Sequence, residues 1–209
     1  MPRTFKYQRL KPWLPLRTPR LILREFRDSD LEAVHAYGSD PEVARFMVWG
    51  PNTLEESRAF LDRVLEAQAV WPRRNVSAAV EIAASGRVIG AVELRVIDPE
   101  NRGGEFGYTF ARDAWGQGYG PEAASALLRQ GFEELGLHRI RATCDARNRR
   151  SWSAMERLGL RREARFREDV RVKGRWRDTY LYAMLKQEWR AGSRTPGELR
   201  ALPSTGVGP

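Results

Sequence analysis

The sequence contains a single cysteine, Cys144, and only two histidines, His35 and His138. One cysteine excludes a disulfide within the chain, and so few sulfur and imidazole groups argue against a Cys/His zinc site. No apolar run approaches the roughly 20 residues that a membrane-spanning helix needs. The first residues, 1–6, lack the apolar core of a secretory signal. These absences predict a soluble, cytoplasmic protein that uses neither a metal nor a membrane.

Lysine is also scarce, since only four of the 36 basic residues are lysines. The chain has a formal net charge of +9, and the segment 139–177 holds 14 of the basic residues but only 5 of the 27 acidic ones. That segment therefore carries the whole positive surplus. Such a block favours a polyanionic partner, either nucleic acid or a phosphate-rich small molecule. The alternative is that the arginines are simply solvated and reflect genomic base composition.

The length of 209 residues fits one domain with short ends. Residues 1–15 are rich in proline and basic side chains and are expected to form an extended arm. Residues 191–209 are rich in Gly, Pro, Ser and Thr and have little to bury, which predicts a flexible tail. The folded domain is therefore placed at residues 16–190.

Helix and strand patterns alternate through this domain. Asp28–Asp30 offers N-cap oxygens to a helix that runs through Ala36, and Thr53 with Glu56 has the spacing of a capping box. Pro121 suits the first turn of a helix to Leu135, and Gly159 ends a helix over Arg150–Leu158. Strands are expected at Leu21–Leu23, Val76–Ala83, Val88–Ile97, Glu105–Ala111, His138–Cys144, Leu160–Val170 and Arg175–Leu185. The order predicts an α/β protein with a central mixed sheet and helices on both faces.

The most informative stretch is Trp115–Ala123, in which glycines alternate at positions 116, 118 and 120. Glycine tolerates positive φ and lets the backbone approach a ligand without a side-chain clash. The stretch joins a predicted strand to a predicted helix, so unpaired N–H groups would point outward beside the positive end of the helix dipole. That arrangement binds phosphate or pyrophosphate. The alternative is a tight turn that binds nothing, but a turn rarely needs three glycines.

Two other phosphate motifs fit this stretch less well. A P-loop requires Gly-Lys followed by Ser or Thr, and the chain has no Gly-Lys pair. Gly118-x-Gly120-x-x-Ala123 matches the dinucleotide fingerprint, but in that fold the first glycine closely follows the strand. Here Arg112–Trp115 intervene, and too little chain follows for a doubly wound sheet.

The stretch resembles the acetyl-CoA pyrophosphate loop of the GCN5-related N-acetyltransferases (GNAT), especially the RimJ/RimL-type branch that modifies N-termini of ribosomal proteins. Further segments are similar to that branch in order and spacing, namely Leu16–Arg24, Glu105–Tyr108, Asn148–Ser151, Glu156–Leu160 and Lys173–Tyr180. The resemblance covers about residues 16–189. It implies a single GNAT domain with a mostly antiparallel central sheet, and it implies acetyl transfer from acetyl-CoA to an amine.

Three residues depart from the family pattern. Trp115 stands where the wider family usually has Gln or Arg, although this branch often has an aromatic residue there. Met155 occupies the place of a tyrosine that is proposed in many members to protonate the leaving thiolate. Pro121 has no N–H, so one donor to phosphate is lost.

The resemblance also assigns residues to the cofactor. The pyrophosphate would be held by the backbone N–H groups of Gln117, Gly118, Tyr119 and Gly120. The strand end near Phe110 would pair with the peptide-like amides of the pantetheine arm, and Asn148 would hydrogen-bond the same arm. Arginines 147, 149 and 150 would meet the phosphates of the adenosine end.

Glu105 is the candidate general base, because burial in an otherwise apolar strand would favour proton abstraction by its carboxylate. The alternative is an edge-strand carboxylate that faces solvent, and Glu93 is the second choice. Ser151 is the candidate partner of the leaving thiolate, where it would orient or relay a proton; otherwise it is a helix N-cap or first-turn residue. Cys144 has no histidine close in sequence to activate it, which favours a buried structural role.

The acceptor is the least defined part of the prediction. An α-amino group titrates near about 8 and a lysine amine near about 10.4, so an α-amine needs less help from a base. Trp49 is expected either to wall an acceptor groove, with Tyr108 below it, or to lie in the core. The leading hypothesis is an acetyl-CoA-dependent N-acetyltransferase acting on the N-terminus of a ribosomal or other protein. A small-molecule amine is the second hypothesis, and a non-catalytic acyl-CoA- or RNA-binding module is the third. The oligomeric state, including a homodimer, stays open.

Overall fold

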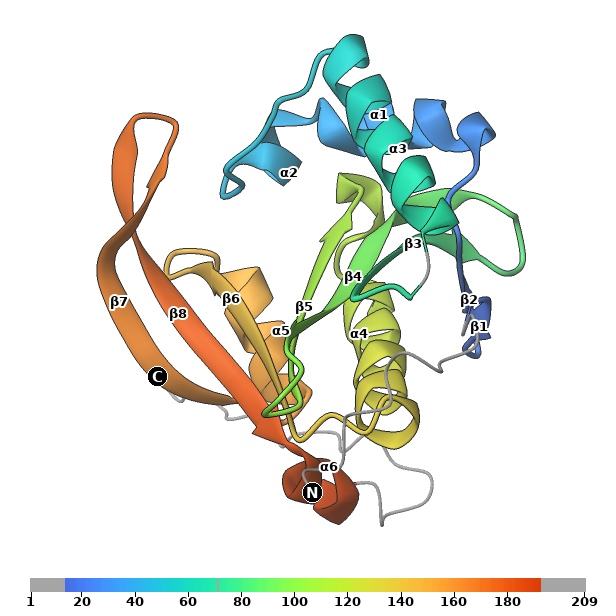
Figure 1. Ribbon diagram of the computed structural model, residues 1–209. Coiled ribbons are helices and arrows are strands. Elements are labelled where there is room, and N and C mark those ends of the chain that lie inside the picture. Colours follow the sequence, from blue (N-terminus) through green and yellow to red (C-terminus); the bar gives the residue numbers. More distant parts are fainter. Residues whose placement is uncertain (1–13, 71, 193–209) are drawn as a thin grey trace, which may run out of the picture.

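The computed structural model in Figure 1 describes residues 14–70 and 72–192. The predicted N-terminal arm, apart from residues 14 and 15, and the predicted tail from residue 193 onward lie outside the described residues. In the described part, eight strands form one sheet in the order β1-β2-β3-β4-β5-β6-β8-β7. Their bounds are β1 Leu16–Arg17, β2 Leu21–Arg24, β3 Asn75–Ile82, β4 Val88–Asp98, β5 Gly103–Phe110, β6 Arg139–Asp145, β7 Arg161–Val172 and β8 Arg175–Leu185.

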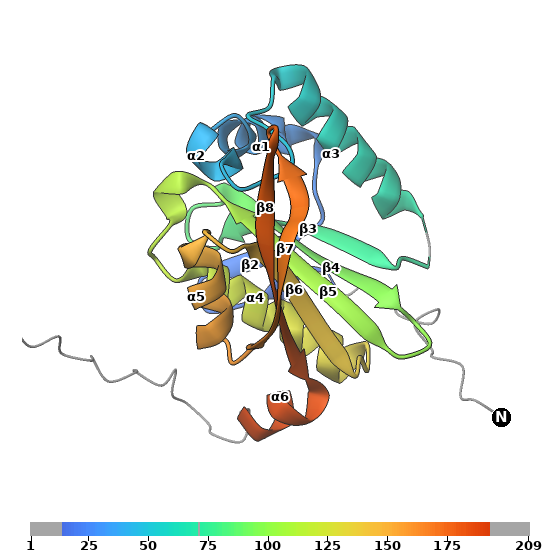
Figure 2. The same ribbon diagram turned by 90° about the vertical axis from the view of Figure 1, so that its left-hand side faces the viewer.

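Helices cover both faces of the sheet. On one face lie α1 (Leu31–Gly38) and α3 (Leu54–Ala69), and on the other lie α4 (Tyr119–Arg129) and α5 (Arg149–Arg157) (Figure 2). The shorter helical segments are η2 Asp28–Asp30, α2 Pro41–Ala44, η3 Arg112–Ala114, the π-helical turn η4 Gln130–Glu134 that continues α4, and α6 Lys186–Gly192. The predicted fold class is confirmed, because the sheet is mixed and mostly antiparallel and is covered on both faces.

Local sequence signals account for several element ends. Glu56 N donates to Thr53 Oγ1 at 3.2 Å and Thr53 N donates to Glu56 Oε2 at 2.8 Å, so the predicted capping box begins α3. Gly159 has a φ of +87° just after α5, which is the conformation that ends a helix at glycine. The sequence therefore fixes the ends of these helices through interactions within a few residues.

Two apolar cores lie on the two faces of the sheet. The larger core packs Val92 and Leu94 of β4 against Leu127 and Leu128 of α4. The smaller core lies under α1 and α3 and contains Phe26, Val34, Tyr37, Leu61, Val64 and Ala79. The alternation of side chains along β4 supplies both cores from one strand, so the central strands are fixed from both faces.

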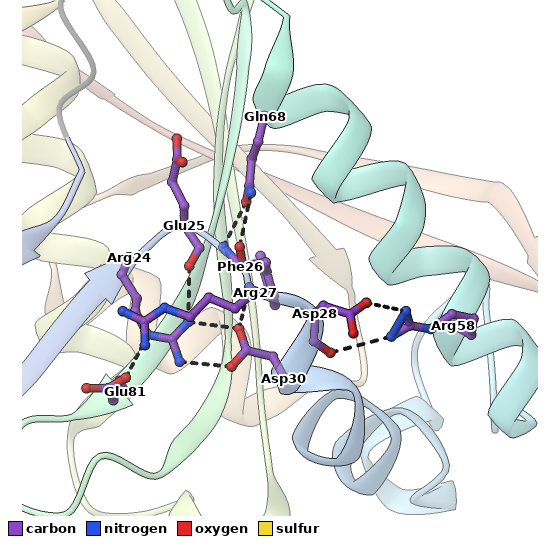
Figure 3. A network of polar contacts seen from close by, with 9 residues as sticks. All are labelled: Arg24, Glu25, Phe26, Arg27, Asp28, Asp30, Arg58, Gln68 and Glu81. Atoms are coloured by element: carbon purple, nitrogen blue, oxygen red, sulfur yellow. Dashed lines mark hydrogen bonds and ion pairs between the residues drawn. The ribbon is translucent and has the colours of Figure 1, made fainter.

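A buried polar network joins β2, η2 and β3 (Figure 3). Arg24 donates from Nη1 and Nη2 to the two carboxylate oxygens of Asp30 at 2.8 and 2.9 Å, and from Nε to Glu81 Oε2 at 2.6 Å. Asp30 also accepts from Arg27 N at 2.8 Å. Within the predicted capping stretch Asp28–Asp30, Asp30 is the N-cap residue of α1 by position, but its side chain makes no cap hydrogen bond to that helix. Its oxygens are instead used to anchor the start of α1 to the sheet.

The sheet opens between β5 and β6, which form its parallel pair. These strands pair only through Gly103–Glu105 and Arg139–Arg141. Beyond this point β5 stays with β4 as far as Phe110, whereas β6 stays with β8 as far as Asp145, so the two strands diverge (Figure 1). Among the described strands, β5 therefore has a partner on only one edge after residue 105.

The hairpin of β7 and β8 closes over this opening from the side of β6. Its turn at Lys173-Gly174 reaches α2, where Lys173 Nζ donates to the carbonyl oxygen of Ala44 at 2.6 Å. This contact joins the two sides of the molecule that flank the opening in the sheet.

Candidate active site

The loop between η3 and α4 has the conformation that anion binding needs. Gly116 and Gly118 have φ values of +76° and +82°, in the region that favours glycine, and Gly118 is the N-cap of α4. Within the described part of the chain, no acceptor takes the N–H groups of Gln117, Gly118, Tyr119 or Gly120. These donors lie at the positive end of the α4 dipole and are available to a phosphate group.

Arg20, which no local sequence signal marks, holds this loop from the turn between β1 and β2. Its Nη1 donates to the carbonyl oxygen of Gln117 at 2.9 Å, and its Nε donates to Glu122 Oε2 at 2.7 Å. Its guanidinium carbon lies 4.7 Å from the centroid of the Tyr119 ring. Only the likeness of Leu16–Arg24 as a block to the GNAT pattern could have pointed to Arg20. The guanidinium places a positive charge beside the free N–H groups.

Glu122, in the first turn of α4, holds Arg20 in place by accepting hydrogen bonds from it. It accepts from Thr18 Oγ1 at 2.5 Å and from Arg20 N at 2.9 Å, in addition to the guanidinium. Burial acts to raise the pKa of Glu122, but the hydrogen bonds from Thr18 and Arg20 outweigh it and leave the pKa below its ordinary value. Glu122 is therefore charged at neutral pH and ties α4 to the β1–β2 turn.

A cavity of about 1020 Å³ occupies the opening between β5 and β6. Its wall takes residues from α1, β4, β5 and β6, from the loop after α2, from the start of α5 and from the β7–β8 hairpin. The candidate site residues that line it are Trp49, Glu93, Tyr108, Cys144, Asn148, Ser151 and Met155. Its lining includes neither Glu105 nor residues 117–120.

The start of α5 connects this cavity to the glycine loop. Asn148 and Ser151 line the cavity, while the guanidinium carbon of Arg150 lies 4.6 Å from the centroid of the Trp115 ring. The start of α5 therefore lies between the glycine loop and the cavity and contacts both.

Asn148 is the N-cap of α5, since its Oδ1 accepts from Ser151 N at 3.2 Å. No partner for its Nδ2 is present in the described part of the chain, so that amide remains a donor at the cavity wall. Ser151 lies in the first turn of α5, as the alternative reading of this residue predicts. Met155 follows one turn later, is 1% exposed and presents no hydroxyl to the cavity.

Tyr108 lies on the wall formed by β5, between the rings of Phe106 and Phe110, with centroid distances of 6.3 and 5.9 Å. Its hydroxyl oxygen is buried and has no hydrogen-bond partner among the described residues. Burial raises the pKa of Tyr108, and the nearby Ser151 hydroxyl acts in the opposite direction. The phenol is therefore protonated at neutral pH.

Cys144 lies beside the same serine, at the end of β6. Burial raises the pKa of its thiol to about 12, and the Ser151 hydroxyl opposes that rise. A thiol with that pKa is protonated at neutral pH, and the thiolate is the nucleophilic form. This argues against an acyl-cysteine intermediate and agrees with the structural role expected for Cys144.

The apolar environment predicted for Glu105 is wrong. Its Oε2 accepts from Arg141 Nε at 2.8 Å, and its Oε1 accepts from Arg95 Nη2. The cause is strand register, because Glu105 pairs with Arg95 across β4–β5 and with Arg141 across β5–β6. The carboxylate joins three strands where the opening begins, and it does not line the cavity.

Glu93, the second choice, does reach the cavity. It lies on β4 opposite Gly107 of β5, whose missing side chain leaves space beside the carboxylate. Its Oε2 is 4.0 Å from Arg95 Nε, and its side chain is 36% exposed. Glu93 is therefore the carboxylate of β4 and β5 with access to a bound substrate.

Two further predicted site residues, Trp49 and Phe110, lie at the cavity wall and at the end of β5. Trp49 is half-buried and lines the cavity on the loop after α2. Phe110 is 7% exposed, and its carbonyl oxygen accepts from Trp115 Nε1 at 2.9 Å. One main-chain acceptor at the end of β5 is thus already used, which leaves the free edge before it for a ligand.

Part of the basic block at 139–177 is balanced by carboxylates. Five of its arginines form ion pairs, which are Arg139–Glu163, Arg141–Glu105, Arg147–Asp145, Arg161–Glu188 and Arg165–Asp178. Within the described residues, Arg149 and Arg150 at the start of α5 form no ion pair. These two arginines therefore leave positive charge at the start of α5, which meets the glycine loop through Arg150 and Trp115.

Within residues 14–70 and 72–192, no group of three or more His, Cys, Asp or Glu side chains is placed to hold a metal ion. No helix in the same part of the chain combines the length and the apolar composition needed to span a membrane.

Comparison with known proteins gives matches over most of the chain. A family model for the acetyltransferase (GNAT) domain matches residues 20–161. YnaD of Bacillus subtilis, named as an uncharacterized N-acetyltransferase, is 35% identical over 173 residues, or 82% of this chain and 97% of that relative. The crystal structure of a GNAT-family acetyltransferase from Bacillus anthracis matches with a TM-score of 0.73 and 32% identity, over 82% of this chain and 98% of that one. The ribosomal protein uS5-alanine N-acetyltransferase of Escherichia coli is 31% identical over 86 residues, or 41% of this chain and 44% of that enzyme.

Proposed function

Because the chain belongs to the GNAT family and is an N-acetyltransferase, we propose that it transfers the acetyl group of acetyl-CoA to the α-amine of a protein or peptide. The observation that carries the proposal is the row of free main-chain N–H groups at residues 117–120, beside an opened sheet. The family assignment favours an enzyme over a non-catalytic binding module.

The donor would be held by groups that have no other partner. The N–H groups of residues 117–120 and the charge on Arg20 would receive the pyrophosphate. The free edge of β5 would pair with the pantetheine amides as an added strand would, and Asn148 Nδ2 would donate from the opposite side. Arg149 and Arg150 would lie near the adenosine phosphates. Together these contacts point the thioester into the cavity.

Acetyl transfer then requires a neutral amine beside the thioester. Glu93 would accept the proton of the incoming ammonium, directly or through water, because its carboxylate lines the cavity and is accessible. Positioning supplies most of the remaining rate, since the thioester is already an activated acyl group.

The charges on the cavity wall favour a single amine on a neutral backbone. Two of the carboxylates are already used, because Glu56 caps α3 and Asp145 pairs with Arg147. Glu93, whose Oε2 lies 4.0 Å from Arg95 Nε, and Asp169 remain, and Arg63 and Arg177 line the same wall. A polyamine would need more unpaired carboxylates than this wall offers. An α-amine also titrates near about 8 and so loses its proton readily. The activity for which the Escherichia coli relative is named, on the alanine of ribosomal protein uS5, supports the same class of acceptor.

An acceptor panel tests the proposal. One peptide with a free α-amine, the same peptide with a blocked N-terminus and an internal lysine, and a polyamine are each incubated with enzyme and acetyl-CoA. Thiol release gives the rate and mass spectrometry gives the site. The proposal requires acetylation at the α-nitrogen of the first peptide; a polyamine or lysine product without an α-amine product would contradict it.

A matched pair of variants tests the role of Glu93. Glu93→Gln should lower kcat by about 10²-fold, which is the lower range for loss of a general base, and should leave the Kd for acetyl-CoA unchanged. Glu105→Gln makes the same change on the neighbouring strand, where the carboxylate has no access to the cavity. A larger fall in kcat for Glu105→Gln than for Glu93→Gln would show that the assignment is reversed.

A further inference from the structure

Cleavage of a thioester leaves a thiolate, which departs more readily when a nearby acid gives it a proton. The inference below rests on the proposed function, since it concerns the leaving group of that reaction. Met155 has no acidic hydrogen, and Ser151 has a weakly acidic hydroxyl, so the proton donor must be sought among the other groups on the cavity wall.

Phenols and thiols are stronger acids than aliphatic hydroxyls, and those on this wall are the hydroxyls of Tyr37 and Tyr108 and the thiol of Cys144. Tyr37 lies on α1, on the opposite face of the sheet from α5. Cys144 lies on β6 and is itself a thiol, so it offers no advantage over the group it would protonate. Tyr108 lies on β5, in the middle of the free edge that would hold the pantetheine arm.

The surroundings of Tyr108 fit a donor whose partner is absent from the free protein. Its hydroxyl oxygen is buried without a hydrogen bond in the described part of the chain, although a buried polar group is normally paired. Its ring is fixed between Phe106 and Phe110, and the first turn of α4 covers it, since a Cβ added at Gly120 would lie 3.8 Å from Tyr108 Cε2. The hydroxyl therefore has a set position beside Ser151, at the boundary of the opening.

We propose that Tyr108 donates the proton to the departing CoA sulfur. The amine nitrogen forms a bond to the acetyl carbon, and the C–S bond then breaks with its electron pair going to sulfur. The O–H proton of Tyr108 moves to that sulfur, and Ser151 or water returns a proton to the phenolate. The ammonium of the acceptor first loses one proton to Glu93, which passes it to solvent. After the attack, the nitrogen loses its second proton to water, which offsets the proton that restores Tyr108, so one proton is released to solvent over the turnover.

Burial supports this role, because it keeps Tyr108 protonated until a thiolate forms beside it. The unpartnered state of the hydroxyl also makes a sharp prediction for Tyr108→Phe. Loss of a buried hydroxyl without a partner removes no hydrogen bond, so the midpoint of thermal unfolding should not fall. A purely structural hydroxyl would instead lower that midpoint.

The experiment compares wild type, Tyr108→Phe and Tyr37→Phe, in which the second variant removes another buried and unpartnered cavity hydroxyl. In Tyr108→Phe, kcat for acetyl transfer should fall by about 10²-fold or more, with the Kd for acetyl-CoA unchanged. In Tyr37→Phe, kcat should stay within about threefold of wild type. Unchanged kcat in Tyr108→Phe, or equal losses in both variants, would overturn the proposal.

A second readout is independent of turnover. The ionisation of the thiol of bound CoA is followed against pH by the ultraviolet absorbance of the thiolate. A hydrogen bond from Tyr108 stabilises the thiolate, so the thiol should ionise about one pH unit lower in the wild type than in Tyr108→Phe. Coincident curves would refute donation to sulfur while leaving the proposed function intact. Failure of the wild type to bind CoA at all would instead remove the proposed function and this inference together.

Discussion

Replacing Gly118 with alanine tests whether the loop conformation is tied to donor binding. Gly118 has a φ of +82°, and an added Cβ would lie 3.2 Å from Arg20 Nη2. A residue other than glycine in this left-handed region costs about 1–2 kcal/mol. The loop relieves that strain by rearranging, and acetyl-CoA must then restore the bound conformation. Because 1–2 kcal/mol corresponds to about a 5–30-fold change in an equilibrium, the Kd for acetyl-CoA should rise by that factor.

Gly86→Ala provides the matched control. Gly86 has a φ of +71° in the β3–β4 turn, and nothing lies within 4 Å of an added Cβ. The same backbone strain arises there, away from the glycine loop, so the free energy of unfolding should fall without a change in Kd. Titration calorimetry with acetyl-CoA and thermal unfolding of both variants give the two quantities. An unchanged Kd in Gly118→Ala, or an equal rise in Gly86→Ala, would refute the link between this loop and the donor.

Two further outcomes follow from buried groups. Asp30→Asn should lower the free energy of unfolding by about 3 kcal/mol in urea at pH 7, because it breaks a buried ion pair with Arg24. Burial acts to raise the pKa of Asp30, but hydrogen bonds from Arg24 and Arg27 outweigh it and hold the pKa below its ordinary value. The contribution of Asp30 to the free energy of unfolding is therefore present above its unfolded pKa of about 3.9 and is lost as pH falls below that value. The unfolding free energies of wild type and Asp30→Asn should then converge in acid. A difference between them that stays constant with pH would contradict this. Cys144, whose thiol has a pKa of about 12, should react with iodoacetamide at pH 7 more slowly than free cysteine, and Cys144→Ala should keep its kcat.

Features that depend on a few neighbouring residues could be predicted from the sequence. Thr53 and Glu56 form the capping box that their spacing predicts. Gly116 and Gly118 take the positive φ values that alternating glycines favour, and Gly118 starts α4. Each of these outcomes follows from backbone sterics and hydrogen bonds within one turn, so no knowledge of the fold was needed.

Features that depend on register between distant segments could not be predicted. Glu105 reads as an isolated carboxylate in an apolar strand, but its surroundings come from Arg95 and Arg141 on the neighbouring strands. Arg20 reaches Gln117 and Glu122, about a hundred residues later in the chain. No periodicity or spacing within either segment specifies which side chain lies opposite across the sheet, and so the surroundings of Glu105 were mispredicted.

The central claim is that the main-chain amides of the glycine loop hold the diphosphate of acetyl-CoA. The most direct measurement is a titration of the isotopically labelled protein with acetyl-CoA, followed through the amide resonances in its NMR spectrum. The account predicts that the amide signals of residues 117–120 shift together and saturate with the calorimetric Kd. Saturable binding of acetyl-CoA that leaves those four signals in place would contradict it.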